Sequence, residues 1–189
     1  PFLIKIAKKR KPILLSTGMS TLEEIEESLN QIKKYNKDIV VLHCTTSYPC
    51  PPNEVNLRAL QTIQDKFDCL VGYSDHTLGL DIIPVAIKSF GAVVVEKHLT
   101  LSKSMEGPDH ISSLEPSEFK KLVRRIKNPK YTPIYNEEIL GSYEKKPTTS
   151  EVLISKSIRK SPIASTRIKQ GEKFSKGNIV IKRPGTGLP

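Results

Sequence analysis

The first 127 residues repeat one pattern, in which a short apolar run is followed by a longer amphipathic stretch. Between Leu22 and about Tyr35, apolar residues recur at helical spacing, and Ser20 with Glu23 forms a capping-box pattern just before them. The apolar runs predict strands at residues 13–15, 39–42, 69–72 and 92–95. Further helices are expected at residues 2–9, around 57–63, at about 80–90 and near 118–126.

Strands this uniformly apolar are typical of a parallel sheet that is covered by helices. Alternating strands and helices predict an α/β fold, either an open doubly wound sheet or part of a (β/α)8 barrel. Four units are too few to close a barrel, which needs eight strands. The chain opens at Pro1 with a helix and no preceding strand. We therefore expect it to start partway through a larger domain, truncated or processed.

The residue composition changes after the fourth strand-and-helix unit. Residues 128–150 contain Pro129, Pro133, Gly141 and Pro147, which predict a linker lying over a surface. Residues 151–189 are short, basic and rich in turn formers, with β-like pieces at 157–158 and 179–181. The sequence therefore predicts a partial barrel over residues 1–127, a linker over 128–150 and the start of a second module from 151.

The composition is that of an ordinary soluble protein, with 37% hydrophobic and 26% charged residues. No apolar run approaches the roughly 18 to 20 residues of a membrane span. Three cysteines (Cys44, Cys50 and Cys69) are too few for a disulfide framework, which favours a cytoplasmic location. The net charge is +10, but only 6% of residues are aromatic. Most of the positive charge is therefore expected on solvated helix faces, with a few groups available to a small anionic substrate, and a basic nucleic-acid module stays an alternative.

Polar residues gather where the predicted strands end. Ser16 and Thr17 follow the first strand, His43 to Tyr48 the second, Ser74 to His76 the third, and Glu96 and His98 the fourth. The carboxyl ends of parallel strands are where α/β barrels and open α/β sheets build their sites. The sequence therefore predicts one site at this edge, with His43, His76 and His98 in equivalent positions.

His76 and His98 are the leading candidates for metal ligands. Two imidazoles with a nearby carboxylate suit a first-row divalent ion that keeps open positions, and Glu96 or Asp109 could supply the carboxylate. The alternative is that each histidine donates a hydrogen bond to a strand-end carbonyl. The loop from Met105 to His110 has two readings as well, a ligand-bearing loop or a simple tight turn.

Several segments together resemble the sialic acid synthases, in the right order and over nearly the whole chain. They are residues 14–19 (LLSTGM), 43–45 with Tyr48-Pro49, 72–77 (GYSDHT), 96–100 (EKHLT), 107–110 (GPDH) with 113–116 (SLEP), and 182–185 (KRPG). The resemblance implies a (β/α)8 barrel followed by an antifreeze-like (SAF) domain. Residues up to 127 would be the second half of that barrel, and residues from 151 would open the antifreeze-like domain.

The resemblance also implies roles for individual residues. His76 and His98 would bind manganese, with Mg²⁺ or Co²⁺ possible in its place. Ser16 and Ser74 would contact phosphoenolpyruvate, while Tyr48 and Asp109 would face the sugar. Glu96 would lie beside the metal and orient substrate, and Arg183 would reach the partner subunit of a homodimer, whose antifreeze-like domain caps the site. Thr46 departs from the family pattern, since some members carry a substrate-contacting asparagine there.

The implied reaction condenses phosphoenolpyruvate with N-acetylmannosamine or a related N-acyl amino sugar. The metal polarises the sugar aldehyde, C3 of the enol attacks it, water adds at C2, and phosphate leaves with C–O cleavage. Several phosphate-binding residues belong to the other half of the barrel, so we expect this fragment alone to be inactive. The alternatives are a legionaminic or pseudaminic acid synthase, and a non-catalytic sugar-binding protein.

Overall fold

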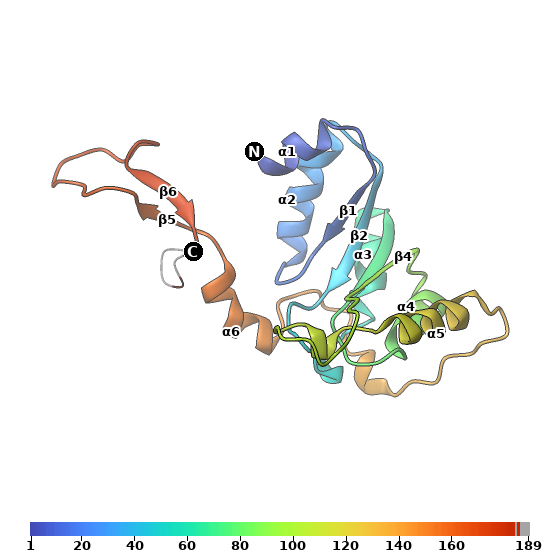
Figure 1. Ribbon diagram of the computed structural model, residues 1–189. Coiled ribbons are helices and arrows are strands. Elements are labelled where there is room, and N and C mark those ends of the chain that lie inside the picture. The colour runs from blue at the N-terminus through green and yellow to red at the C-terminus, as the bar shows by residue number, and fades with distance from the viewer. Residues whose placement is uncertain (184, 186–189) are drawn as a thin grey trace. The chain divides into compact units, whose positions relative to one another are not determined.

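The computed structural model describes residues 1–183 and 185. The chain divides into two compact units, residues 1–148 and residues 149–189. The first unit contains a four-stranded sheet of β1 (Ile13–Ser16), β2 (Ile39–Cys44), β3 (Leu70–Asp75) and β4 (Val94–Lys97). These strands pair in parallel in the order β1-β2-β3-β4 (Figure 1).

Helices alternate with the strands as the pattern predicts. They are α1 (Phe2–Ala7), α2 (Leu22–Lys33), α3 (Ala59–Phe67), α4 (Ile82–Phe90) and α5 (Pro116–Lys127), with short 3₁₀ helices η1 (Pro52–Glu54), η2 (His110–Ser112) and η3 (Glu137–Ile139). Sequential strands lie side by side throughout, whereas a doubly wound sheet reverses its order at a switch point. The strand order therefore decides between the two architectures in favour of a parallel half-barrel.

One cap differs from the prediction. The N-cap of α2 is Thr21 rather than Ser20, because Ser20 Oγ donates instead to the carbonyl of Gly18 at 3.4 Å. Thr21 Oγ1 accepts from Glu24 N, and Thr21 N donates to Glu24 Oε2 at 3.0 Å. The capping box is thus present one residue later than expected.

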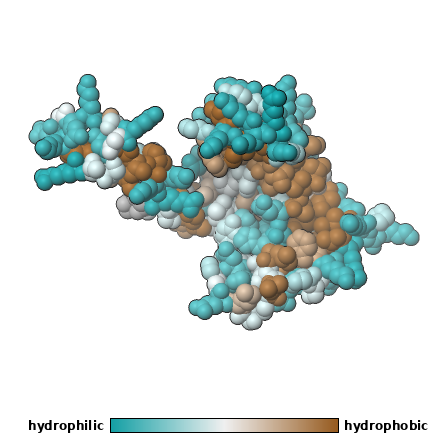
Figure 2. All heavy atoms as spheres, turned by 45° about the horizontal axis from the view of Figure 1, so that its top comes forward, coloured by the Kyte–Doolittle hydropathy of each residue, from teal (hydrophilic) through white to brown (hydrophobic). Residues whose placement is uncertain are grey.

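The hydrophobic core lies between one face of the sheet and the helices. Its strand residues are Ile13, Leu15, Ile39, Val41, Val71, Tyr73 and Val95, all at odd positions. On the opposite face, Leu14 and Leu70 are 52% and 56% exposed. Figure 2 shows a broad apolar area on the surface of the first unit. The sheet is therefore covered by helices on one face. The other face, which would line a barrel and is called the open face, is exposed at Leu14 and Leu70, whereas Leu42 on β2 is fully buried.

Residues 128–150 were predicted as a linker over a surface, and as far as residue 148 they form part of the first unit. Leu57 N donates to Ile139 O and Arg58 N to Leu140 O, both at 3.0 Å, and the side chains of Ile139 and Leu140 are buried. Arg58 also binds the carbonyl of Gly141 at 2.7 Å and the carboxylate of Glu137 at 2.8 Å. The compact unit therefore extends to residue 148.

The second unit consists of α6 (Thr149–Ile158) and a hairpin-like antiparallel pair, β5 (Ser161–Ala164) and β6 (Ile179–Lys182). The β-like piece expected at 157–158 is wrong, because those residues complete α6. The strand expected at 179–181 is confirmed as β6. Within residues 1–183 and 185, no helix is long and apolar enough to cross a bilayer.

Candidate functional site

The predicted site residues share one face of the sheet because side chains alternate along a strand. Cys44, Ser74 and Glu96 are register partners on neighbouring strands, so their side chains leave the same, open face. Ser16, the last residue of β1, is also at an even position, so its side chain leaves the same face. His76 and His98 lie two residues beyond Ser74 and Glu96. The structure therefore brings the predicted residues of four strands to one edge of one face.

His43 does not belong to this group, contrary to the prediction. It lies inside β2 at an odd position, so its ring points into the layer between sheet and helices, 6.0 Å from the ring of Tyr73. Its Nε2 contacts the carbonyl of Val55 at 2.8 Å, and its Nδ1 is buried without a hydrogen-bond partner. Burial, followed by the charge of Lys145, lowers the pKa of His43 to about 3. His43 is thus a neutral core residue.

Three rings form the centre of the site. Tyr48 stacks on His76 with centroids 4.0 Å apart and lies 5.2 Å from the ring of His98. The two imidazoles meet edge to face at 5.6 Å. The loop that carries Tyr48 is tied to β3 because Cys50 N donates to the carbonyl of His76 at 2.8 Å. Tyr48 and His76, which are 28 residues apart in the sequence, are thereby held in contact.

The ring of His76 is prepared to act as a ligand. Its Nδ1 lies 2.7 Å from the carbonyl of Thr45, so Nδ1 carries the proton and Nε2 keeps a lone pair. A backbone carbonyl that orients an imidazole in this way is the usual outer partner of a metal-bound histidine. Burial is the main cause that lowers the pKa of His76, which favours the neutral ring that a metal requires.

The donor set fits a divalent ion with two protein ligands from this chain. His76 and His98 offer two imidazoles, which suit a first-row ion. No group of three or more His, Cys, Asp or Glu side chains able to hold a metal occurs among the residues that the structure describes. That Glu96 or Asp109 supplies a carboxylate to the ligand set stays a prediction. Glu96 Oε1 accepts a 2.6 Å hydrogen bond from Ser74 Oγ.

Tyr48 brings a hydroxyl into the same space. Burial, followed by the charges of Cys44, Asp109 and Glu96, raises the pKa of Tyr48 to about 12. The phenol therefore stays protonated and can donate a hydrogen bond at any working pH. The charges of Glu96 and Asp109 act in the same direction as burial on the pKa of this hydroxyl.

The loop after β4 is closed at its base. Thr100 N donates to Leu114 O and Leu114 N donates to His98 O, both at 2.9 Å. Inside the loop, His110 Nδ1 and Thr100 Oγ1 lie 2.7 Å apart, and Ser113 Oγ donates to the carbonyl of Asp109 at 2.7 Å. These contacts hold the exposed Asp109 at the N-cap of η2. The loop is thus an ordered structure rather than a simple tight turn.

The loops after β1 and β2 meet at Gly18 and Thr46. A Cβ on Gly18 would lie 2.0 Å from Thr46 Oγ1 and 3.4 Å from Cys44 Sγ. Glycine is therefore required for this close approach. Thr46 lies in the loop after β2, and its contact with substrate stays a prediction. Arg183 lies in the second unit, exposed and just after β6.

The sequence reasoning missed two buried charges beside the histidines. Asp75 Oδ2 and Lys97 Nζ form an ion pair at 2.8 Å, and each side chain is 1% exposed. Asp75 directly precedes His76, and Lys97 directly precedes His98. This repeated charged-residue–histidine pattern at two strand ends is the sequence signal that could have identified them.

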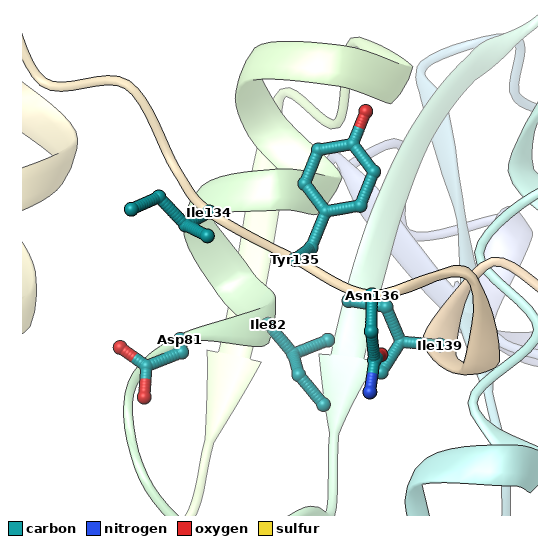
Figure 3. A pocket seen from close by; sticks show the side chains of 6 residues that line it. All are labelled: Asp81, Ile82, Ile134, Tyr135, Asn136 and Ile139. Carbon is teal, nitrogen blue, oxygen red and sulfur yellow. The ribbon is translucent and has the colours of Figure 1, made fainter.

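A pocket of about 390 Å³ lies elsewhere in the first unit, between the start of α4 and residues 134–139 (Figure 3). Its lining residues are Asp81, Ile82, Ile134, Tyr135, Asn136 and Ile139. None of the predicted site residues contributes to it. The candidate site is therefore the polar edge of the sheet rather than this pocket.

Known proteins give an independent comparison. Residues 1–133 match the NeuB family. Over 191 residues the chain is 48% identical to the N,N′-diacetyllegionaminic acid synthase of Campylobacter jejuni, covering 100% of this chain and 55% of that protein. It is 35% identical to human N-acetylneuraminate-9-phosphate synthase over 183 residues, covering 96% of this chain and 49% of that protein.

A solved structure of a related protein matches the fold of this chain as well. The crystal structure of the spore coat polysaccharide biosynthesis protein SpsE from Bacillus subtilis superposes with a TM-score of 0.84 at 31% identity. The match covers 98% of this chain and 54% of that chain. This chain thus spans about half the length of the proteins it matches. With a family match over residues 1–133 and these levels of identity, the chain belongs to the NeuB family.

Proposed function

We propose that this chain forms part of a metal-dependent synthase that condenses phosphoenolpyruvate with an N-acyl amino sugar, giving a nine-carbon 2-keto sugar acid and phosphate. The observation that carries the proposal is the gathering of Ser16, Ser74, Glu96, His76 and His98 on one open face of the parallel sheet. Membership of a family of sugar acid synthases supports the same reaction class.

His76 and His98 would hold a divalent cation, with Mn²⁺ the first candidate and Mg²⁺ or Co²⁺ as alternatives. When bound, the ion supplies Lewis-acid polarisation of the sugar aldehyde. The protein's own contribution is the orientation of each imidazole, which for His76 comes from the 2.7 Å contact with the Thr45 carbonyl. Metal-ligating histidines depend on such partners for their ring orientation.

The hydroxyls would bind the anionic substrate. Ser16 and Ser74 have the same parity on strands β1 and β3, and each can donate to a carboxylate or phosphate oxygen. Ser74 already donates to Glu96 Oε1 at 2.6 Å, so substrate binding would exchange one anionic acceptor for another. Glu96 would then be free to orient the second substrate or the water that adds at C2.

The sugar would lie toward Tyr48, Thr46 and Asp109. Tyr48 offers a protonated hydroxyl, since its pKa is raised to about 12, and Asp109 offers an exposed carboxylate from an ordered loop. Donors and acceptors of this kind suit a polyhydroxy substrate. Arg183, which follows β6, would recognise the N-acyl group in the neighbouring subunit of a homodimer, with residues from 151 as the start of an antifreeze-like domain that caps the site.

A specific observation favours one acceptor over another. Identity to the diacetyllegionaminic acid synthase is 48%, against 35% to the human N-acetylneuraminate-9-phosphate synthase. We therefore propose a di-N-acetylated amino sugar as the preferred acceptor, with N-acetylmannosamine as the second candidate.

The test is phosphate release from phosphoenolpyruvate by the protein expressed from its whole reading frame. The assay contains Mn²⁺ and a panel of mono- and di-N-acetylated amino sugars, with EDTA as the metal control. We expect EDTA-sensitive phosphate release with one sugar of the panel. A folded protein that binds these sugars without releasing phosphate would instead support a non-catalytic sugar-binding role.

A further inference from the structure

The ion pair between Asp75 and Lys97 is buried where charges are costly. The two residues are register partners on β3 and β4, and each side chain is 1% exposed. Five other described ion pairs, such as Arg125 with Asp81, leave every side chain at least 25% exposed. Because two apolar residues often stabilise a protein as well as a buried ion pair, stability alone does not explain this pair.

The contacts of the pair enclose His76. Asp75 Oδ1 accepts from Thr77 N at 3.0 Å and from Thr77 Oγ1 at 2.8 Å, which closes an Asx-type turn around residue 76. Lys97 Nζ donates to the carbonyl of Thr77 as well as to Asp75 Oδ2. The backbone on both sides of His76 is therefore bound to the pair.

The same contacts fix His98. Lys97 precedes His98 directly, and its ammonium joins the end of β4 to the turn that follows β3. His76 and His98 leave the sheet on the opposite face from the pair, one residue beyond each partner, and their rings meet at 5.6 Å. The pair therefore adds a side-chain link between the two backbone segments from which the rings of His76 and His98 project.

We propose that Asp75 and Lys97 are positioning residues, which hold His76 and His98 at the spacing needed to bind one divalent cation. This inference rests on the proposed function. Partners outside the ligand shell typically change metal affinity by about 10- to 100-fold when they are mutated. A buried ammonium–carboxylate pair can act in this way because it is short and its direction is fixed by four further hydrogen-bonding atoms around Thr77 and Tyr73.

The experiment uses the protein from its whole reading frame and three variants. Lys97→Met alone leaves the Asp75 carboxylate buried and unpaired, and we expect it to unfold readily. Asp75→Asn/Lys97→Met removes both charges together, while the Asn oxygen can still accept from Thr77. The matched control is Arg125→Met, which breaks an ion pair on the outside of α5.

We measure Mn²⁺ affinity by electron paramagnetic resonance and thermal unfolding by circular dichroism. For the double variant we expect a melting temperature close to wild type but Mn²⁺ binding weakened by about 10- to 100-fold. Arg125→Met should bind Mn²⁺ as the wild type does. A double variant with wild-type Mn²⁺ affinity would overturn the proposal, and so would a loss of affinity that merely follows the loss of melting temperature across all variants.

A second readout needs no metal and separates this proposal from the proposed function. In the metal-free protein at pH 8, ¹⁵N spectra report whether His76 keeps its proton on Nδ1, as its contact with Thr45 requires. We expect this signal in the wild type and in Arg125→Met, and its loss or averaging between tautomers in the double variant. If the wild type binds no Mn²⁺, the metal-dependent function fails. The positioning role is still decided by this signal, and an unchanged signal in the double variant overturns it.

Discussion

Ser74 Oγ donates a 2.6 Å hydrogen bond to Glu96 Oε1 across the paired strands β3 and β4. The two residues are register partners, so their side chains leave the open face of the sheet side by side. At the end of a parallel sheet, the Ser74 hydroxyl can donate to a substrate anion in place of the Glu96 carboxylate. The relationship makes the proposed role of Ser74 testable.

Replacing Ser74 with Ala should raise the KM for phosphoenolpyruvate about 10-fold or more, because a hydrogen bond to a charged group contributes about 1.5–3 kcal/mol. Steady-state kinetics of the protein from its whole reading frame measures this change. Ser117→Ala, on the exposed first turn of α5, is the matched control and should leave KM unchanged. An unaltered KM in Ser74→Ala would remove Ser74 from the substrate site.

Replacing His76 or His98 with Ala should abolish metal-dependent turnover, since the two imidazoles are the proposed metal ligands. Phosphate release and Mn²⁺ binding are measured for both variants at pH 8. His43→Gln serves as the control, because the ring of His43 points into the core and Gln can keep the contact with the Val55 carbonyl. Full activity in either alanine variant would contradict the metal assignment.

The protein should lose stability as the pH falls below 6.5, and His43 should account for a defined part of the loss. Its pKa is lowered from 6.5 to about 3 in the folded protein, so the unfolded chain binds more protons between these values. Stability therefore falls as the pH decreases through this window. At pH 5 the contribution of His43 is about 2 kcal/mol relative to pH 8.

Urea unfolding of wild type and His43→Gln at pH 8 and pH 5 measures this contribution. The variant should lose about 2 kcal/mol less than the wild type between the two pH values. His76, whose pKa is also lowered by burial, acts in the same direction in both proteins and cancels in the comparison. An identical pH dependence in the two proteins would show that His43 can be protonated without cost.

Replacing Gly72 with Ala should destabilise the first unit by about 1–3 kcal/mol through overpacking. An added Cβ would lie 2.6 Å from the carbonyl oxygen of Val94 and 2.4 Å from Leu42 Cδ2, so strands β2 and β4 would have to move. Thermal unfolding measures the loss. Gly177→Ala is the control, since its nearest atom would be Ser175 Oγ at 3.5 Å. Equal stability of the two variants would mean that the strands yield freely.

Much of the fold was predictable from local patterns. Apolar runs located all four strands of the parallel sheet, because strands buried among helices contain few polar residues. The predicted cap at Ser20 missed by one residue, since its hydroxyl and that of Thr21 are equivalent in sequence. The path of residues 129–148 was not predictable in detail, because it depends on distant partners such as Asn56 and Arg58.

The sequence by itself determined the strand-and-helix order, the family to which the chain belongs and the positions of the polar residues at strand ends. Only the tertiary structure decided which face each side chain takes. Strand parity and register place His76 and His98 on the open face, and they turn His43 into the core and pair Asp75 with Lys97. The physical reason is that side-chain direction depends on where a strand begins and how it pairs, and a shift of one residue reverses it.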